Sequence, residues 1–143
     1  MWFDDQAEEA MNFYISIFKN SKALNVSPGP NGKAMSVGFE LDGQEFMALN
    51  AGPQFKFTEA ISMFVSCENQ DEVDEFWEKL SAGGEEGRCG WLKDKYGLSW
   101  QIVPTALGEM LGDPDATKSK RVLEAMLKMS KIDIKQLQQA RDQ

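Results

Sequence analysis

Residues 93–104 read KDKYGLSWQIVP, and this stretch decides the fold. Gly97 stands where a tight turn needs a residue that tolerates positive φ, and the residues on either side favour strands. The two predicted strands, Cys89–Lys93 and Ser99–Val103, form a hairpin. Because side chains alternate along a strand, Ser99, Gln101 and Val103 share one face, and Trp100 and Ile102 share the other.

A second hairpin is predicted around Asp42-Gly43, since a two-residue Asp-Gly link supplies the positive φ that a tight hairpin turn requires. Its strands are Ser36–Leu41 and Gln44–Leu49. Further strands are predicted over Lys22–Val26 and over Ala60–Cys67, which is apolar and rich in β-forming residues.

Each hairpin follows a predicted amphipathic helix. The first begins with a capping box, Asp5 with Glu8, and the second with Asn69 and Glu72. The helical stripe of the first recurs in the second at a constant shift of 63 residues: Ala10, Phe13, Tyr14 and Ile17 correspond to Val73, Phe76, Trp77 and Leu80. The order of strand, helix and hairpin thus occurs twice, which indicates an internal repeat.

The last part of the chain is predicted to be helical. Asp113-Pro114 starts one helix, and Asp133 caps another, with Ile132 and Leu137 placed as a hydrophobic staple. The apolar face of the first of these helices is formed by Val122, Ala125, Met126 and Met129. Two arrangements are open: the stripes pack on the chain's own sheet, or they form a dimer contact.

Composition narrows the class of protein. The chain has 143 residues, 42% of them hydrophobic and 27% charged, which suits one compact domain. Its net charge of −8 disfavours nucleic-acid binding, which needs clustered Lys and Arg. No apolar run is long enough to span a membrane. Two cysteines, Cys67 and Cys89, cannot form a zinc cage, and free thiols suit the cytoplasm.

The complete absence of histidine limits the chemistry. A Ser-His-Asp triad is impossible, and no imidazole is present to activate Cys67 or Cys89 as a nucleophile.

Three segments carry a resemblance to a known family: DDQAEEAMNFY at 4–14, QDEVDEFWEKLSAGG at 70–84 and GWLKDKYGLSWQIVP at 90–104. The chain resembles the vicinal oxygen chelate (glyoxalase/bleomycin resistance/dioxygenase) superfamily, in its PhnB-like branch, often labelled 3-demethylubiquinone 3-methyltransferase-like. The resemblance covers nearly the whole chain, the tail included. It implies an α+β fold in which paired βαβββ modules form a glyoxalase-like half-barrel, followed by C-terminal helices.

The resemblance also implies the organisation of the chain. We expect a single domain over 1–143, with module one at 1–51, a connector at 52–59, module two at 60–104 and a helical tail at 105–143. The chain begins almost inside a strand, so we expect a few residues before Met1.

Metal-dependent members of the superfamily hold a divalent ion with His and Glu from the first and fourth strands of each module. Carried over by position, the first ligand would lie before Met1, and the others fall on Met47, Ser62 and Gln101. A thioether, a neutral hydroxyl and an amide bind hard cations weakly. We therefore expect no metal and no cofactor.

The cavity that the resemblance implies would be apolar with a few polar groups, which suits a small organic ligand. Its expected lining consists of Trp2, Met47, Leu49, Ser62, Phe64, Ser66, Trp91, Ser99 and Gln101. The alternative is that these residues only fill the barrel. Glu45 is the one inward carboxylate, a weak candidate for a general base, or simply a surface charge at the end of a strand.

The function expected from these features is binding of a small, partly apolar metabolite or xenobiotic, without a conventional metal site, by a cytoplasmic homodimer. One alternative is an enzyme acting on a small organic substrate, either demethylubiquinone methyltransferase-like or a lyase, isomerase or dioxygenase. Another is an interaction module built around the tail helices.

Overall fold

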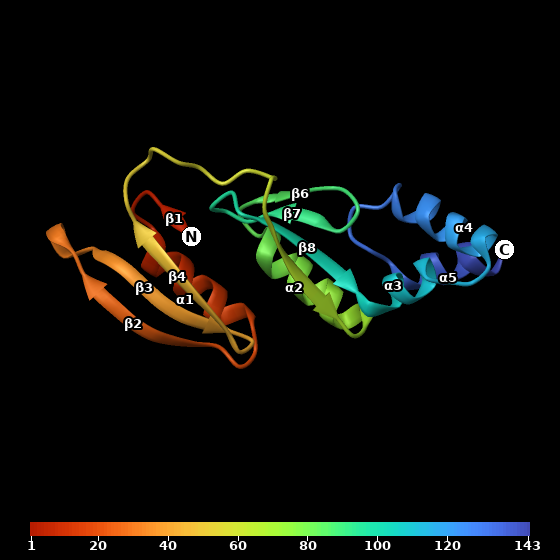
Figure 1. Cartoon of the computed structure of the whole chain (residues 1–143), viewed down its shortest axis with the longest axis horizontal. Helices are drawn as coiled ribbons and strands as arrows, with labels where there is room; N and C mark the ends of the chain where they lie inside the picture. The colour runs from red at the N-terminus through yellow and green to blue at the C-terminus, as the bar shows by residue number, and fades with distance from the viewer. The chain divides into compact units, whose positions relative to one another are not determined.

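The computed structural model describes residues 1–143, and the chain divides into two compact units, Met1–Phe57 and Thr58–Gln143. Each unit contains one four-stranded sheet with a helix on one face (Figure 1). The strand order is β1-β4-β3-β2 in the first unit and β5-β8-β7-β6 in the second, and in both the first strand pairs in parallel with the fourth. This identical order confirms the internal repeat and the paired βαβββ modules of the glyoxalase-like α+β fold.

The first unit has its core between α1 and one face of the sheet. Its elements are β1 (Trp2–Phe3), α1 (Ala7–Ile17), β2 (Lys22–Pro28), a 3-10 turn (Pro30–Gly32), β3 (Ala34–Leu41) and β4 (Gln44–Asn50). Tyr14 of α1 is fully buried and stacks on Phe39 of β3, with 6.4 Å between ring centroids. The predicted turn is present, with positive φ at both Asp42 and Gly43.

The predicted capping box at the start of α1 is wrong. The helix begins one residue later than an Asp5 cap would give, with Gln6 as N-cap and no side-chain cap bond. Asp5 instead pairs with Lys33 at 2.9 Å. The amide of Asn50 on β4 supplies the cap, because its oxygen accepts from the backbone N–H of Ala7 at 2.8 Å and its nitrogen donates to the carbonyl of Ala34.

The second unit repeats this arrangement and adds three helices. Its elements are β5 (Ser62–Cys67), α2 (Gln70–Ser81), β6 (Glu85–Glu86), β7 (Trp91–Lys93), β8 (Ser99–Pro104), α3 (Thr105–Leu111), α4 (Ala116–Met126) and α5 (Ile134–Asp142). The Asn69 cap is confirmed, since its side chain accepts from the N–H of Glu72 at 2.9 Å. In a capping box the carboxylate of Glu72 would accept from the N–H of the cap residue, Asn69. Here it accepts from the N–H of Glu68, one residue earlier.

The turn between β7 and β8 is held by one buried carboxylate. Asp94 is 2% exposed, and one of its oxygens accepts from the backbone N–H groups of Tyr96 and Leu98 at 2.9 and 3.0 Å. Its other oxygen accepts from the indole of Trp100 at 2.8 Å. Gly97 completes the turn at φ +86°. A buried carboxylate is tolerated because it is fully hydrogen-bonded, and these bonds fix the register of the hairpin.

The tail helices pack mainly on one another, and α3 also contacts strand β8. Their apolar stripes are therefore buried within the chain, but mostly against other helices and not directly on its sheet. Their buried core consists of Leu107, Met110, Val122, Met129, Ile132 and Leu137.

The predicted cap at Asp133 is confirmed by its bond from the N–H of Gln136 at 3.0 Å. The predicted start at Asp113-Pro114 is wrong, because Asp115 caps α4 two residues later. Helix α3 was not predicted; Gly108 lowers its intrinsic helix propensity, and burial of Leu107 and Met110 offsets that cost.

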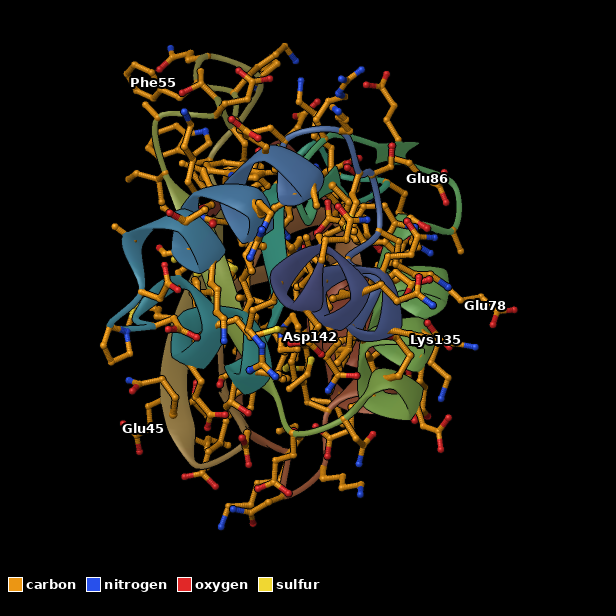
Figure 2. The ribbon with its side chains drawn as sticks, turned by 90° about the vertical axis from the view of Figure 1, so that its right-hand side faces the viewer. Glu45, Phe55, Glu78, Glu86, Lys135 and Asp142 are labelled. Atoms are coloured by element: carbon orange, nitrogen blue, oxygen red, sulfur yellow. The ribbon has the colours of Figure 1, made fainter.

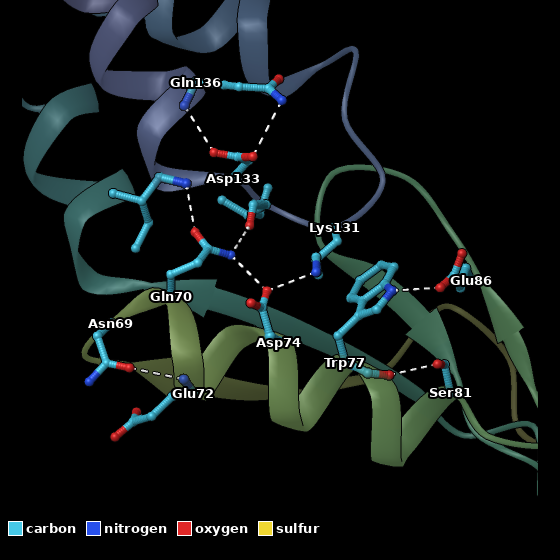
Figure 3. A network of polar contacts seen from close by, with 12 residues as sticks. Asn69, Gln70, Glu72, Asp74, Trp77, Ser81, Glu86, Lys131, Asp133 and Gln136 are labelled. Carbon is cyan, nitrogen blue, oxygen red and sulfur yellow. Dashed lines mark hydrogen bonds and ion pairs between the residues drawn. The ribbon is translucent and has the colours of Figure 1, made fainter.

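Gln70, at the start of α2, ties the tail to the module (Figure 3). Its amide oxygen accepts from the N–H of Ile134 at 2.8 Å, and its nitrogen donates to the carbonyl of Ile132 at 3.0 Å. One turn further along, Asp74 pairs with Lys131 at 2.8 Å. The bond from Lys131, and then that from Gln70, lower the pKa of Asp74, so this contact is present at neutral pH and is lost only as acid protonates the carboxylate.

No helix of the chain has the length and apolar character that a bilayer crossing requires.

Changing Asp94 to Asn should lower the free energy of unfolding by about 2–3 kcal/mol, because the amide nitrogen would then face the indole N–H, a second donor. Urea denaturation followed by far-UV circular dichroism measures the change. The exposed Asp4→Asn is the matched control and should cost less than about 0.5 kcal/mol. Equal effects of the two changes would contradict a role for Asp94 in holding the hairpin.

Changing Gln70 to Ala should loosen the tail, because the carbonyl of Ile132 and the N–H of Ile134 both lose their partner. We expect the free energy of local opening of the tail to fall by about 1–2 kcal/mol. Amide exchange over residues 132–142 should therefore become about 5- to 30-fold faster. Hydrogen–deuterium exchange with mass spectrometry reads this directly. Gln138→Ala, an exposed change on α5, should leave the rate unaltered, and a tail equally protected in both variants would refute the expected role.

Candidate functional site

In each unit, one face of the sheet is covered by a helix, and the opposite face, here called the open face, is not. In the second unit the open face carries two cross-strand rows of side chains. Register places Ser62, Ser99, Lys93 and Glu85 side by side in one row. The next row contains Phe64, Gln101 and Trp91. Trp100 and Ile102 point to the helix face, as the alternation predicted, and both are buried.

Five of the six predicted cavity residues of this unit lie in these two rows. Ser66, the sixth, lies one step further along the same face, opposite Val103. Phe64 is 63% exposed, which is unusual for an aromatic side chain on a sheet. It lies next to Gln101, whose side-chain N–H donates to the hydroxyl of Ser62 at 2.9 Å. An accessible apolar ring beside a fixed amide and hydroxyl is an arrangement that suits a small organic molecule.

The residues at the positions of the superfamily's metal ligands do not fit a divalent ion. Ser62 and Gln101 are neutral and hydrogen-bonded to each other, and Met47 offers only a thioether. Nowhere in the chain do three or more His, Cys, Asp or Glu side chains lie together in a way that could hold a metal ion. The donor chemistry of these positions therefore supports hydrogen bonding to an organic ligand and not Lewis-acid catalysis.

A hollow of about 120 Å³ lies beside the first row, and we call it the Trp91 hollow. Its wall includes two predicted cavity residues, Trp91 and Ser99. Its other six wall residues were not predicted: Glu59, Glu85, Glu86, Gly87, Leu92 and Lys93. The side chains of Lys93 and Glu59 form an ion pair, and the carboxylate of Glu59 raises the pKa of Lys93. Sequence could not show this pair, because Glu59 lies in the connector and carries no pattern of its own.

The remaining predicted residues lie on the open face of the first unit. Trp2 of β1 is paired with Leu49 of β4, and Met47 of β4 is 68% exposed. The indole of Trp2 donates to the carbonyl of Gly52 at 2.9 Å and meets the ring of Phe55 edge-on at 4.9 Å between centroids. This unit therefore offers a second apolar surface with a fixed aromatic ring.

Glu45 also lies on β4, on the same side as Met47 by alternation. It is exposed, its side chain points outward from the ribbon (Figure 2), and the residue opposite it on β3 is another carboxylate, Glu40. The side chain is therefore open to solvent and close to another acidic group. Its catalytic role stays a prediction.

A larger hollow, of about 480 Å³, lies in the first unit at the start of α1. None of the predicted cavity residues lines it, and its wall is polar and mainly acidic, with Asp5, Glu8 and Glu9 around Lys33. It is wide open, and the pair formed by Asp5 and Lys33 is itself exposed on both sides. We place the candidate site on the open faces, where polar and apolar groups converge, and not in this acidic recess.

The cysteines offer no activated nucleophile. Burial, followed by the nearby charge of Glu72, raises the pKa of Cys67 to about 12, so its thiol stays protonated at neutral pH. Cys89 is partly exposed and free.

The comparisons with known proteins agree with this geometry. A family model described as 3-demethylubiquinone-9 3-methyltransferase matches residues 1–103. The PhnB protein from Bacillus cereus is 36% identical, with a TM-score of 0.69, over 73% of this chain and 95% of that one. A protein from Pseudomonas aeruginosa, 19% identical over 72% of this chain and 91% of its own, has a TM-score of 0.60 and shows likeness of fold alone. No curated protein matches the chain.

The family match stops before the tail, so the expectation that the resemblance includes the tail helices is wrong. The matched part contains both modules and every predicted site residue. The chain therefore belongs to the 3-demethylubiquinone-9 3-methyltransferase family and has the glyoxalase-like fold of its PhnB-like branch.

Proposed function

We propose that the protein binds a small, partly apolar organic molecule, a metabolite or a xenobiotic, on the open face of its second unit, without a conventional metal site. The observation that carries this proposal is the exposed ring of Phe64 beside the hydrogen-bonded pair of Gln101 and Ser62. The ring supplies apolar contact area, and the amide and hydroxyl are held in place to orient polar groups of a ligand.

Trp91 and Ser99 extend this surface on the same sheet, and Ser66 borders it. The open face of the first unit offers comparable groups, with Met47, Leu49 and Trp2 forming its apolar part. Exposed apolar side chains gathered on one face mark binding surfaces more often than scattered ones do.

We also propose a homodimer, located in the cytoplasm. Leu123 of α4 and Leu127, the C-cap of that helix, lie one turn apart and are 42% and 52% exposed, whereas Val122 and Met129 are buried and Ala125 and Met126 are partly buried. A second copy of the chain would cover these leucines. Free thiols at Cys67 and Cys89 suit a reducing compartment.

A bound organic molecule should be detected when the purified protein is examined by native mass spectrometry. Phe64→Ala should lower its occupancy several-fold, because about 1–2 kcal/mol of apolar contact is lost. Ile61→Ala is the control: Ile61 is an apolar residue of the same unit, 67% exposed, and it lies before β5, outside the two rows of the open face. A loss as large in the control would argue against the open face as the binding surface.

The protein should have twice the 16.1 kDa mass of the chain in light scattering coupled to size exclusion. Leu127→Glu should shift it towards the monomer, because a charge buried against a second copy without a partner is costly. Leu24→Glu, on strand β2, is the control, since Leu24 is 41% exposed and lies outside the tail. A wild-type monomer would contradict the dimer, and a dimer insensitive to Leu127→Glu would contradict a contact through α4.

A further inference from the structure

The Trp91 hollow contains a buried polar group with no partner. The hydroxyl of Ser99 has no hydrogen bond, although Ser99 is only 1% exposed. The neighbours of Ser99 in its cross-strand row are Ser62, which is engaged with Gln101, and Lys93, which is engaged with Glu59. Buried hydroxyls are nearly always paired in folded proteins, so an unpaired one in the wall of a hollow points to a missing partner inside it.

The wall of the hollow has an excess of negative charge. It contains three carboxylates, Glu59, Glu85 and Glu86, and one ammonium group, that of Lys93. Lys93 is committed to Glu59, and the carboxylate of Glu86 accepts from the indole of Trp77 at 2.8 Å. Glu85 lies next to Lys93 in the same row, and its charge, after that of Glu59, also raises the pKa of Lys93, but Glu85 forms no ion pair of its own. It is the carboxylate of the wall that remains available to an occupant.

The aromatic wall and the size of the hollow restrict the occupant further. Trp91 is half-buried on β7, and an indole ring attracts cations to its face. A volume of about 120 Å³ is below the range of about 300–1,000 Å³ that holds a whole drug-sized ligand. It does accommodate the head of a ligand, whose apolar remainder would extend along the open face towards Phe64.

We propose that the Trp91 hollow binds a protonated primary or secondary amine. The ammonium group lies against the face of Trp91, donates one hydrogen bond to the hydroxyl of Ser99 and pairs with the carboxylate of Glu85. This inference rests on the proposed function and deepens it, because it names the chemical class of the ligand's polar group.

Benzylamine, protonated at neutral pH, and benzyl alcohol, its neutral counterpart of similar shape, are suitable probes. Titration followed by the indole N–H signals of 15N-labelled protein should shift the signal of Trp91, with benzylamine bound at least about 10-fold more tightly than benzyl alcohol. Glu85→Gln should weaken benzylamine about 5- to 10-fold and leave benzyl alcohol unchanged. Glu78→Gln, an exposed change on α2, is the control and should alter neither.

Ser99→Ala tests the hydroxyl separately, and should weaken both probes because each can bond to it, without loss of folding, since the lost group has no partner in the protein. Three results would each overturn the amine site. The first is equal affinity for the two probes, and the second is unchanged benzylamine affinity in Glu85→Gln. The third is a titration in which the indole N–H signal of Trp91 does not shift. If a co-purified ligand is still lost in Phe64→Ala while benzylamine fails to bind, the amine site is refuted and the proposed function stands.

Discussion

The buried carboxylate of Asp94 is the constraint on which the candidate site depends. Its bonds to two backbone N–H groups of the turn and to the indole of Trp100 fix how β7 and β8 pair. Since side chains alternate along a strand, a slip of one residue would bring Gln101 under the helix and send Trp100 to the open face. The indole bond opposes such a slip directly, because Trp100 reaches Asp94 only from the helix face.

That register brings together Ser62 and Gln101, the two positions of this unit where the resemblance would place ion ligands. The two residues lie on adjacent strands, and the side-chain N–H of Gln101 donates to the hydroxyl of Ser62. An amide and a hydroxyl form hydrogen bonds readily but bind hard cations weakly. The exposed ring of Phe64 lies beside this hydrogen-bonded pair, so apolar and polar groups are adjacent on the same face.

The features that sequence predicted are those that arise from local chemistry. Asp42-Gly43 specifies its own turn, and Asn69 caps a helix whose first N–H groups are three residues away. The start of α4 was misplaced by only two residues, but the failure at α1 is non-local. Asn50 caps α1 from a strand 43 residues further along, which leaves Asp5 free to pair with Lys33. The alternation of strands showed which of the predicted residues share a face, but it could not show that the hydroxyl of Ser99 is unpaired, or that Glu59 reaches Lys93 from the connector.

The tail, which lies outside the family match, supports the segment that leads into the Trp91 hollow. Met129 and Ser130 accept backbone bonds from Cys89 and Gly90, both at 2.8 Å. Gly90 has φ +84°, and a Cβ there would lie 3.0 Å from the carbonyl oxygen of Ile102 and 3.2 Å from the side chain of Ile132, so the backbone conformation and both close approaches favour glycine. Trp91 follows directly. Because Gln70 anchors the same stretch of tail from the other side, the position of the indole in this protein depends on residues that the shared modules do not contain.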